Sequence, residues 1–265
     1  MGIGLAYLGL GVFSGFLAGL LGIGGGLVIV PVLTAIFTVQ QLAPQYVVHL
    51  ALGTAFACIL FSSTASFWAH HRHGAVRWDI VKHIAPGILA GVVLGSTVVA
   101  QIPGMYLKLF FGGLEFLVGT QMLLDLKPRT HRQLPGKVGM IGVGGFIGAV
   151  SSAGGIGGGV LSVPFLLWCN VTLRDTIGTS AAIGFPIAAG GTIGYMINGL
   201  AIKGLPAFSL GFVYLPALLG VVAASVVTAP LGARIAHRAN GPWLRRIFAL
   251  LLYAFGIKML WVAWV

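Results

Sequence analysis

The first 71 residues of this chain contain no Lys, Arg, Asp or Glu, and the first residue of these types is Arg72. A run of about 20 apolar residues is long enough to cross the hydrocarbon core of a bilayer, so this stretch alone can cross several times. Over all 265 residues only 7% are charged, whereas an average soluble domain carries about 25%. These features exclude a soluble enzyme and predict a polytopic integral membrane protein.

The 15 basic residues outnumber the four acidic ones and lie in short tracts between apolar runs. This distribution is typical of orientation by positive charge on the cytoplasmic side, and we expect no nucleic-acid partner. His70, His71 and His73 have no neighbouring carboxylate or thiol that would complete a metal site, so neither a metal nor a cofactor is expected. Cys58 and Cys169 lie in apolar runs, which makes a disulfide framework improbable.

Pro, Gly and charged residues divide the apolar sequence into ten segments. Two of them, the second and the seventh, have only half the usual spanning length. All six tryptophans lie near segment ends, where membrane proteins place aromatic anchors. The segments cover residues 3–21, 27–37, 46–69, 80–100, 105–124, 138–153, 160–168, 176–197, 208–231 and 243–262.

The second half of the chain repeats the first. Residues 22–31, GIGGGLVIVP, recur as GIGGGVLSVP at residues 155–164, with a Gly-Thr pair downstream of each copy. The second copy carries three extra residues around residues 151–153. We therefore predict an N-terminal transmembrane repeat (1–124), a cytoplasmic linker (125–137) and a C-terminal transmembrane repeat (138–265).

The positive-inside rule favours five crossings in each repeat. If the two short segments cross the membrane, all basic residues except Lys108, Lys203 and Lys258 face the cytoplasm. If the short segments instead enter the membrane and leave on the same side, five other basic residues lie outside. An odd number of crossings per repeat inverts the second relative to the first. The expected fold is thus an all-α membrane protein with two inverted-topology repeats of about five helical segments, and each repeat contains a short helix broken by glycine.

Two glycine clusters are the strongest candidates for a functional site. Consecutive glycines destabilise a helix by about 1 kcal/mol each, and a broken backbone survives in the membrane only where protein or water satisfies it. Turns of this kind expose backbone N–H groups, and the helix that follows adds its positive dipole end. We expect the two turns to meet and bind a small anion, although glycine can instead serve only close helix packing, as we expect for Gly15, Gly91 and Gly194.

The duplicated G-x-G-G-G-x-x-x-x-P element, the following Gly-Thr pair and the hydropathy profile resemble the TauE/SafE sulfite exporter family, within the toluene sulfonate uptake permease superfamily. The resemblance covers essentially the whole chain and implies transport of sulfite, sulfonates or related sulfur oxyanions across a bacterial inner membrane. The motif carries over to the glycines and to Pro31 and Pro164, where we expect structural helix breaks. The first half departs from the second, because Gly53-Thr54-Ala55 lacks the serine found in Gly178-Thr179-Ser180.

Hydroxyl groups near the turns are further candidates, because they donate to anion oxygens and are inexpensive to bury; local bonding to helix carbonyls is the equal alternative. Glu115 is the acid deepest within a predicted span, so it either carries a coupling proton or pairs with a cation such as Lys258. The predicted substrate-binding residues are Gly22, Gly24, Gly25, Gly26, Thr54, Ser151, Ser152, Gly155, Gly157, Gly158, Gly159, Thr179 and Ser180.

We therefore expect a secondary transporter, and not an enzyme, that exports a small sulfur-containing anion by alternating access. The alternative is an anion channel that uses the same glycine turns as a selectivity filter. The expected partners are the small anionic substrate, the lipid bilayer and a coupling proton or sodium ion. The oligomeric state does not follow from the sequence.

Overall fold

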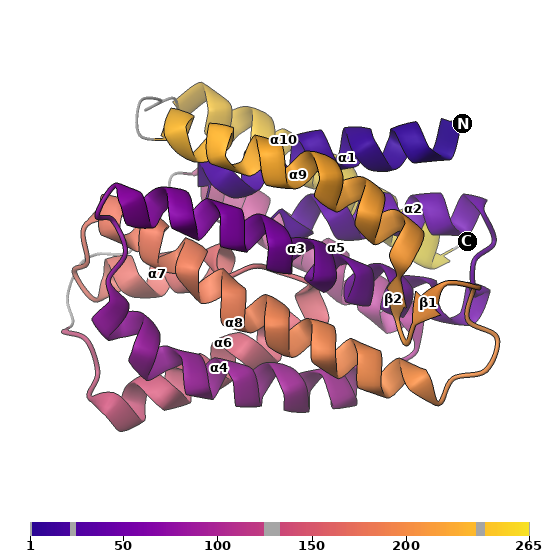
Figure 1. Ribbon diagram of the computed structural model, residues 1–265, viewed down its shortest axis with the longest axis horizontal. Helices are drawn as coiled ribbons and strands as arrows, with labels where there is room; N and C mark the ends of the chain where they lie inside the picture. The colour runs from indigo at the N-terminus through magenta and orange to yellow at the C-terminus, as the bar shows by residue number, and fades with distance from the viewer. Residues whose placement is uncertain (1, 22–24, 125–132, 237–241, 265) are drawn as a thin grey trace.

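The computed structural model describes residues 2–21, 25–124, 133–236 and 242–264, and these are almost entirely helical (Figure 1). The elements are α1 Gly2–Leu21, α2 Gly26–Val39, the 3-10 turn η1 Pro44–Tyr46, α3 Val47–Arg72, α4 Trp78–Val99, α5 Gly104–Leu123, α6 Lys137–Gly154, α7 Gly159–Trp168, α8 Leu173–Leu200, β1 Ser209–Leu210, β2 Val213–Tyr214, α9 Leu215–Ala236 and α10 Pro242–Trp264.

Each of the ten predicted segments overlaps one helix, because the segment ends were placed at the Pro, Gly and charged residues that also end helices. The prediction was wrong at the start of α9. Residues 208–214 continue the apolar run but form a two-stranded antiparallel hairpin, in which Ser209 pairs with Tyr214. Phe208 and Gly211 adopt positive φ angles of 64° and 56° there, which a helix does not allow.

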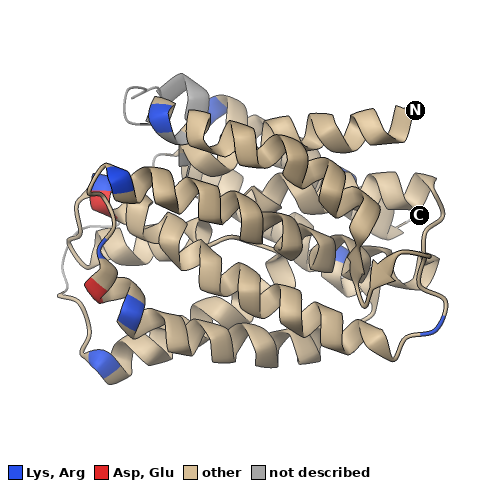
Figure 2. Ribbon diagram, viewed as in Figure 1, with Lys and Arg blue, Asp and Glu red and all other residues tan. Residues whose placement is uncertain are grey.

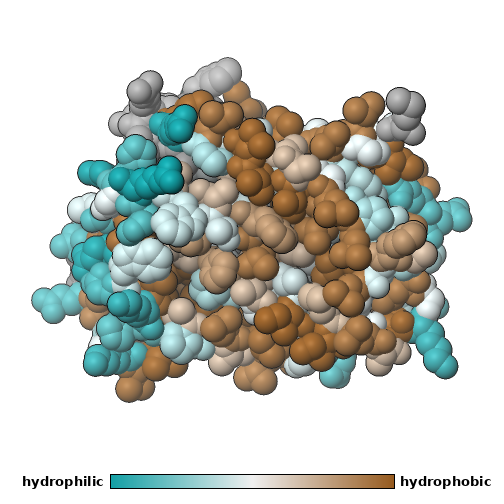
Figure 3. All heavy atoms as spheres, in the orientation of Figure 1, coloured by the Kyte–Doolittle hydropathy of each residue, from teal (hydrophilic) through white to brown (hydrophobic). Residues whose placement is uncertain are grey.

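The long helices lie side by side along the longest axis of the molecule, and both termini lie at the same end (Figure 1). Among the described residues, seven helices are long and apolar enough to cross a membrane, and α2 and α7 are shorter apolar helices. Hydrophobic side chains cover the middle of the visible face, whereas hydrophilic ones gather toward its two ends (Figure 3). This distribution matches a protein whose helices run across a bilayer.

Helices from the two halves of the chain pack across each other rather than forming separate bodies. The most extensive pairings are α1 with α9 and α4 with α6, followed by α5 with α10 and α3 with α8. When α1–α5 are matched in order with α6–α10, the α1–α9 pair becomes the α6–α4 pair. The α3–α9 pair likewise becomes the α8–α4 pair, and the α5–α10 and α3–α8 pairs map onto themselves, so each of the most extensive helix pairings is consistent with the sequence repeat.

Glycine permits these close pairings, as the sequence predicted. A β-carbon on Gly15 would lie 2.5 Å from Ser225 Cα of α9. One on Gly91 would collide with the Gly145 carbonyl oxygen of α6, and one on Gly194 with the Ser96 hydroxyl of α4. The packing interpretation is therefore confirmed at these three positions, because no larger side chain would fit between the helices.

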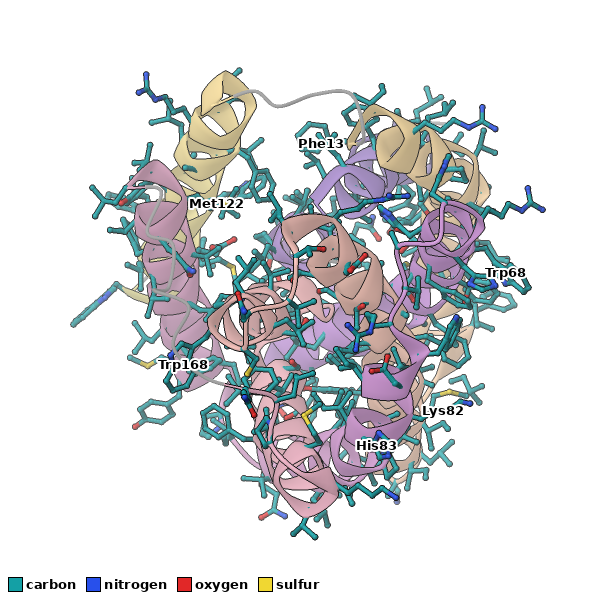
Figure 4. The ribbon with its side chains drawn as sticks, turned by 90° about the vertical axis from the view of Figure 1, so that its left-hand side faces the viewer. Phe13, Trp68, Lys82, His83, Met122 and Trp168 are labelled. Carbon is teal, nitrogen blue, oxygen red and sulfur yellow. The ribbon has the colours of Figure 1, made fainter. Side chains whose placement is uncertain are left out.

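Charged side chains gather at the end of the bundle opposite the termini, where α3 ends and α4 begins (Figure 2). Seen from this end, Met122 and Trp168 lie on one side of the bundle, whereas Trp68, Lys82 and His83 lie on the other (Figure 4). Trp68 is 53% exposed and Trp168 is 39% exposed. Exposed tryptophans at helix ends are typical of a membrane–water interface.

Candidate functional site

Both glycine clusters interrupt the helices, as predicted. Gly25 precedes α2 with a left-handed φ of 74°, and Gly155 follows α6 with a φ of 53°. The second turn continues through Gly157 and Gly158 to the start of α7 at Gly159, and the described residues of both turns are buried. Gly22 and Gly24 of the first cluster lie outside the described residues.

The two turns lie in direct contact with each other. A β-carbon on Gly26 would collide with the carbonyl oxygen of Gly155, and one on Gly155 would lie 2.6 Å from Val30 Cγ2 and 2.8 Å from Leu52 Cδ2. Among the described residues, no side chain caps the N-terminus of α2 or of α7. Helices α2 and α7 therefore each start, without a side-chain cap among the described residues, at one of two buried turns. These turns adjoin each other and come from opposite halves of the chain.

Pro31 and Pro164 do not break the helices, and this prediction was wrong. Pro31 lies inside α2 and Pro164 lies inside α7, and both helices continue past them. Each proline removes one intrahelical N–H donor, but neighbouring helices in a membrane bundle tolerate such a loss. The breaks lie at the glycines that precede each helix.

Ser151 and Ser152 form the end of α6 immediately before the second turn, and both are buried. The carbonyl of Ser151 accepts the backbone N–H of Gly155. The Ser152 hydroxyl donates to the carbonyl of Ala149 (2.6 Å), and the Ser152 carbonyl accepts the hydroxyl of Tyr195 from α8 (2.9 Å). Tyr195 is fully buried and thus fixes the approach of α6 to the turn.

The other side of the second turn lies against α8. A β-carbon on Gly158 would be 2.9 Å from the backbone nitrogen of Gly184. Ser162 of α7 donates to the carbonyl of Gly158, and its oxygen lies 2.8 Å from the hydroxyl oxygen of Ser180. Ser180 is therefore linked to the turn through Ser162, which bonds both Ser180 and the carbonyl of Gly158.

Thr54 and Thr179 make equivalent contacts in the two halves, which we call the threonine bridges. The backbone N–H of Tyr214, just before α9, donates to Thr54 Oγ1 (3.0 Å), and that of Arg77, just before α4, donates to Thr179 Oγ1 (3.0 Å). The glycines that precede the two threonines lie against the carbonyls of Phe212 and Ala75 respectively. Each bridge joins segments more than 100 residues apart.

Both hydroxyls of the threonine bridges are thus engaged within the protein. Thr54 also donates to the carbonyl of Leu50 (2.7 Å), and both threonines are fully buried. Next to the second bridge, the side chain of Arg77 binds Asp79 (2.6 Å) at the protein surface, and this hydrogen bond raises the pKa of Arg77. The bridges hold the N-terminal ends of α4 and α9 in place.

Glu115 lies on the buried face of α5, with Phe111 one turn before it and Val118 one turn after. Its side chain is fully buried, and neither carboxyl oxygen has a hydrogen-bond partner among the described residues. Lys258, the cation considered from the sequence, is exposed. The neighbouring Leu114 packs against Gly154 at the end of α6, which brings this part of α5 to the second glycine turn.

Sequence reasoning did not identify Ser162 and Tyr195 as site residues. Ser162 carries a signal, because its repeat counterpart is Ile29 and a polar residue therefore replaces an apolar one. Tyr195 carries none, since its contact with Ser152 spans 43 residues and depends on how α6 and α8 pack.

The apolar exterior and the seven described helices long and apolar enough to cross a membrane define a polytopic membrane protein (Figure 3). The chain matches the Sulfite exporter TauE/SafE family over residues 7–259, so it belongs to this family of membrane transporters.

Curated relatives support the same class. A protein of Haemophilus influenzae named "Probable membrane transporter protein" is 36% identical over 94% of this chain and 95% of its own length. A protein of Xylella fastidiosa with the same name is 30% identical over 97% of this chain and 95% of its own length. A relative in Methanocaldococcus jannaschii, also named a probable membrane transporter protein, is 26% identical over 94% of this chain and 92% of its own length. No solved structure matches the chain.

Proposed function

We propose that this protein is a secondary transporter that exports sulfite, an organosulfonate or a related small sulfur-containing anion across the bacterial cytoplasmic membrane. The observation that carries the proposal is the contact between two buried glycine turns, in which Gly26 at the start of α2 lies against Gly155 at the end of α6, and each turn leads into a helix whose N-terminus has no side-chain cap among the described residues. A helix N-terminus carries roughly half a positive charge. Backbone N–H groups at such ends bind anions without a buried Lys or Arg.

The substrate class follows from family membership together with this chemistry. The family is named for sulfite export, and sulfite and sulfonates present several oxygens that accept hydrogen bonds. Among the described residues near the turns, the hydrogen-bond donors are backbone amides and serine hydroxyls, of which those of Ser152 and Ser180 are already bonded within the protein. This set suits a small oxyanion better than a large or cationic solute.

Alternating access is supported by the exchange of helix pairs between the halves. We propose that the halves are inverted-topology repeats that rock against each other around the glycine turns. The first half begins at the end of the bundle that carries both termini, and α6 begins near the opposite end (Figure 1). Successive halves that run in opposite directions support inversion. The threonine bridges, each of which joins the first half of the chain to the second, are contacts that such a motion would make and break.

Glu115 is the proposed carrier of the coupling proton. A carboxylate in hydrocarbon without a partner is costly, and Glu115 has no partner among the described residues. A protonated carboxyl avoids this cost and releases its proton when the site opens to water. Sodium is the alternative coupling ion, and a dependence of transport on sodium would replace this part of the proposal.

Uptake into proteoliposomes tests the proposed function. Purified protein should transport at least one of sulfite, thiosulfate and methanesulfonate with saturation and counterflow, and discriminate against sulfate, with empty liposomes as the background. Transport should respond to an imposed pH gradient. Single-channel currents in planar bilayers without counterflow would instead establish the anion channel, and no flux of any of these anions would refute the substrate class.

The contact between the turns has its own test in Gly26→Ala. The new methyl group would collide with the Gly155 carbonyl and separate the two turns, so we expect transport to fall at least tenfold while the protein still inserts into the membrane. Gly113→Ala is the matched control, because nothing lies within 4 Å of a β-carbon at this helical position. Full transport by Gly26→Ala would remove the contact from the mechanism.

A further inference from the structure

Ser14 differs from most buried serines and threonines of the described helices. Those side chains donate to a carbonyl one turn earlier in their own helix, as helical hydroxyls in apolar surroundings commonly do; they include Thr54, Ser62, Ser63, Ser96, Ser152, Thr192 and Ser225. The Ser14 side chain makes no such bond. It is 1% exposed, and its hydroxyl has no hydrogen-bond partner among the described residues.

The unpartnered hydroxyl lies beside the first glycine turn. A β-carbon on Gly25 would be 2.8 Å from the Ser14 carbonyl oxygen and 3.4 Å from Ser14 Cβ, and the hydroxyl oxygen is one bond further. Gly25 is the N-cap of α2, a helix of 14 residues, and no side chain caps it. A buried donor without an acceptor therefore adjoins the N-terminus of a helix, where an anion is favoured.

Other contacts of α1 do not account for this hydroxyl. The neighbouring Gly15 packs against Ser225 and Thr228 of α9, and Thr228 bonds within its own helix. Neither α1 nor α2 contains a charged residue, so neither of the two helices that flank this turn supplies a side-chain cation. A buried hydroxyl that lacks a partner is expected to find one when the substrate is bound.

The second half of the chain has no equivalent of Ser14. The repeat counterpart, at the offset of 130 residues that relates Gly15 to Gly145, is Gly144. A β-carbon on Gly144 would collide with the carbonyl oxygen of Ile84, so that position serves the packing of α6 on α4. A hydroxyl at this location is therefore specific to the first turn.

We propose that the Ser14 hydroxyl binds the transported anion by donating a hydrogen bond to one of its S–O oxygens at the N-terminus of α2. The inference rests on the proposed function and deepens it, because it assigns the substrate a side-chain ligand that the sequence did not reveal. It also makes the site asymmetric: the first half supplies a free hydroxyl, whereas the second supplies a hydroxyl pair, Ser162 and Ser180, that is already hydrogen-bonded.

Binding measurements on Ser14→Ala test this assignment. The dissociation constants of purified protein for sulfite, thiosulfate and methanesulfonate are measured separately by calorimetry, and proteoliposome uptake is measured in parallel. We expect Ser14→Ala to bind the transported anion about tenfold more weakly, which corresponds to one hydrogen bond to a charged group. Its melting temperature without anion should not fall, since the variant loses no bond present in the free protein.

Ser225→Ala is the matched control. Ser225 is equally buried and lies on the neighbouring α9, but its hydroxyl donates to Val222 in its own helix (3.4 Å). It should bind the anion like the wild type. Ser14→Cys, which keeps the side chain's size with a weaker donor, should also bind more weakly and serves if Ser14→Ala does not reach the membrane.

The outcomes separate this inference from the proposed function. Wild-type binding and uptake with an unchanged dissociation constant in Ser14→Ala would overturn the role of Ser14 and leave the proposed function standing. A wild-type protein that neither binds nor transports any of the three anions would refute the proposed function and, with it, this assignment.

Discussion

At the scale of single residues, the polar side chains of the interior divide into two groups. Thr54, Thr179, Ser152 and Ser180 satisfy their hydroxyls within the protein, whereas Glu115 and Ser14, like Thr34 and Ser66, have no side-chain hydrogen-bond partner among the described residues. Unsatisfied buried polar groups are rare in folded proteins because each costs free energy. Where they persist in a membrane interior, a functional role is the default explanation.

Glu115→Gln tests the proton-coupling role directly. The substitution keeps the size and polarity of the side chain but removes the titratable proton. We therefore expect it to abolish the stimulation of uptake by an imposed pH gradient, with substrate binding retained. The measurement is anion uptake into proteoliposomes at several internal and external pH values.

Asp175→Asn is the control for Glu115→Gln, because Asp175 lies in the first turn of α8 near the charged end of the bundle. It should keep the pH response of the wild type. If Glu115→Gln keeps this response as well, the coupling ion does not pass through Glu115.

At the scale of whole elements, the sequence predicted the helices well because two local signals coincide in it. Hydropathy indicates the membrane spans, and Gly, Pro and charged residues indicate their ends. Each of the ten predicted segments therefore overlaps a helix. The glycine turns were predictable for the same reason, since a repeated cluster of glycines is a local signal. The hairpin at 208–214 was missed because its residues are as apolar as the helix that follows.

Contacts between distant segments were beyond the reach of the sequence. The Gly-Thr pairs were recognised, but their partners before α9 and α4 lie 160 and 102 residues away. Ser14 gave no signal, because nothing local indicates that its hydroxyl lacks a partner. The identities of candidate residues near the turns were thus predictable, whereas the direction and occupancy of their hydrogen bonds depend on helix packing.

The threonine bridges give a prediction at this scale. Thr54→Val and Thr179→Val preserve shape but leave the N–H of Tyr214 or of Arg77 without its acceptor, at a cost of about 1–3 kcal/mol. Each variant should melt several degrees Celsius lower, since a chain of this size loses about 2–4 °C per kcal/mol.

The melting of purified protein in detergent measures this effect. Thr64→Val is the control, because Thr64 donates only to Leu60 in its own helix (2.7 Å) and should melt close to the wild type. Equal melting of all three variants would show that the bridges do not hold the starts of α4 and α9.

At the scale of the whole molecule, charge and hydropathy predict the orientation in the membrane. Most of the described charged residues gather at one end, and the two termini lie at the other (Figure 2). Basic residues are retained on the cytoplasmic side of bacterial membranes. We therefore expect the end at which α3 meets α4 to face the cytoplasm and the termini to face outward.

Substituting cysteine for one of two exposed lysines at a time tests this orientation. Lys82 lies in α4 near the charged end, and Lys203 lies in the loop between α8 and β1. A membrane-impermeant maleimide should label Lys203→Cys in intact cells but label Lys82→Cys only in everted vesicles. The native Cys58 and Cys169 are buried, so wild-type protein should give a low background in both preparations. The reverse labelling pattern would place the charged end outside. Each half of the chain would then cross the membrane in the direction opposite to the expected one.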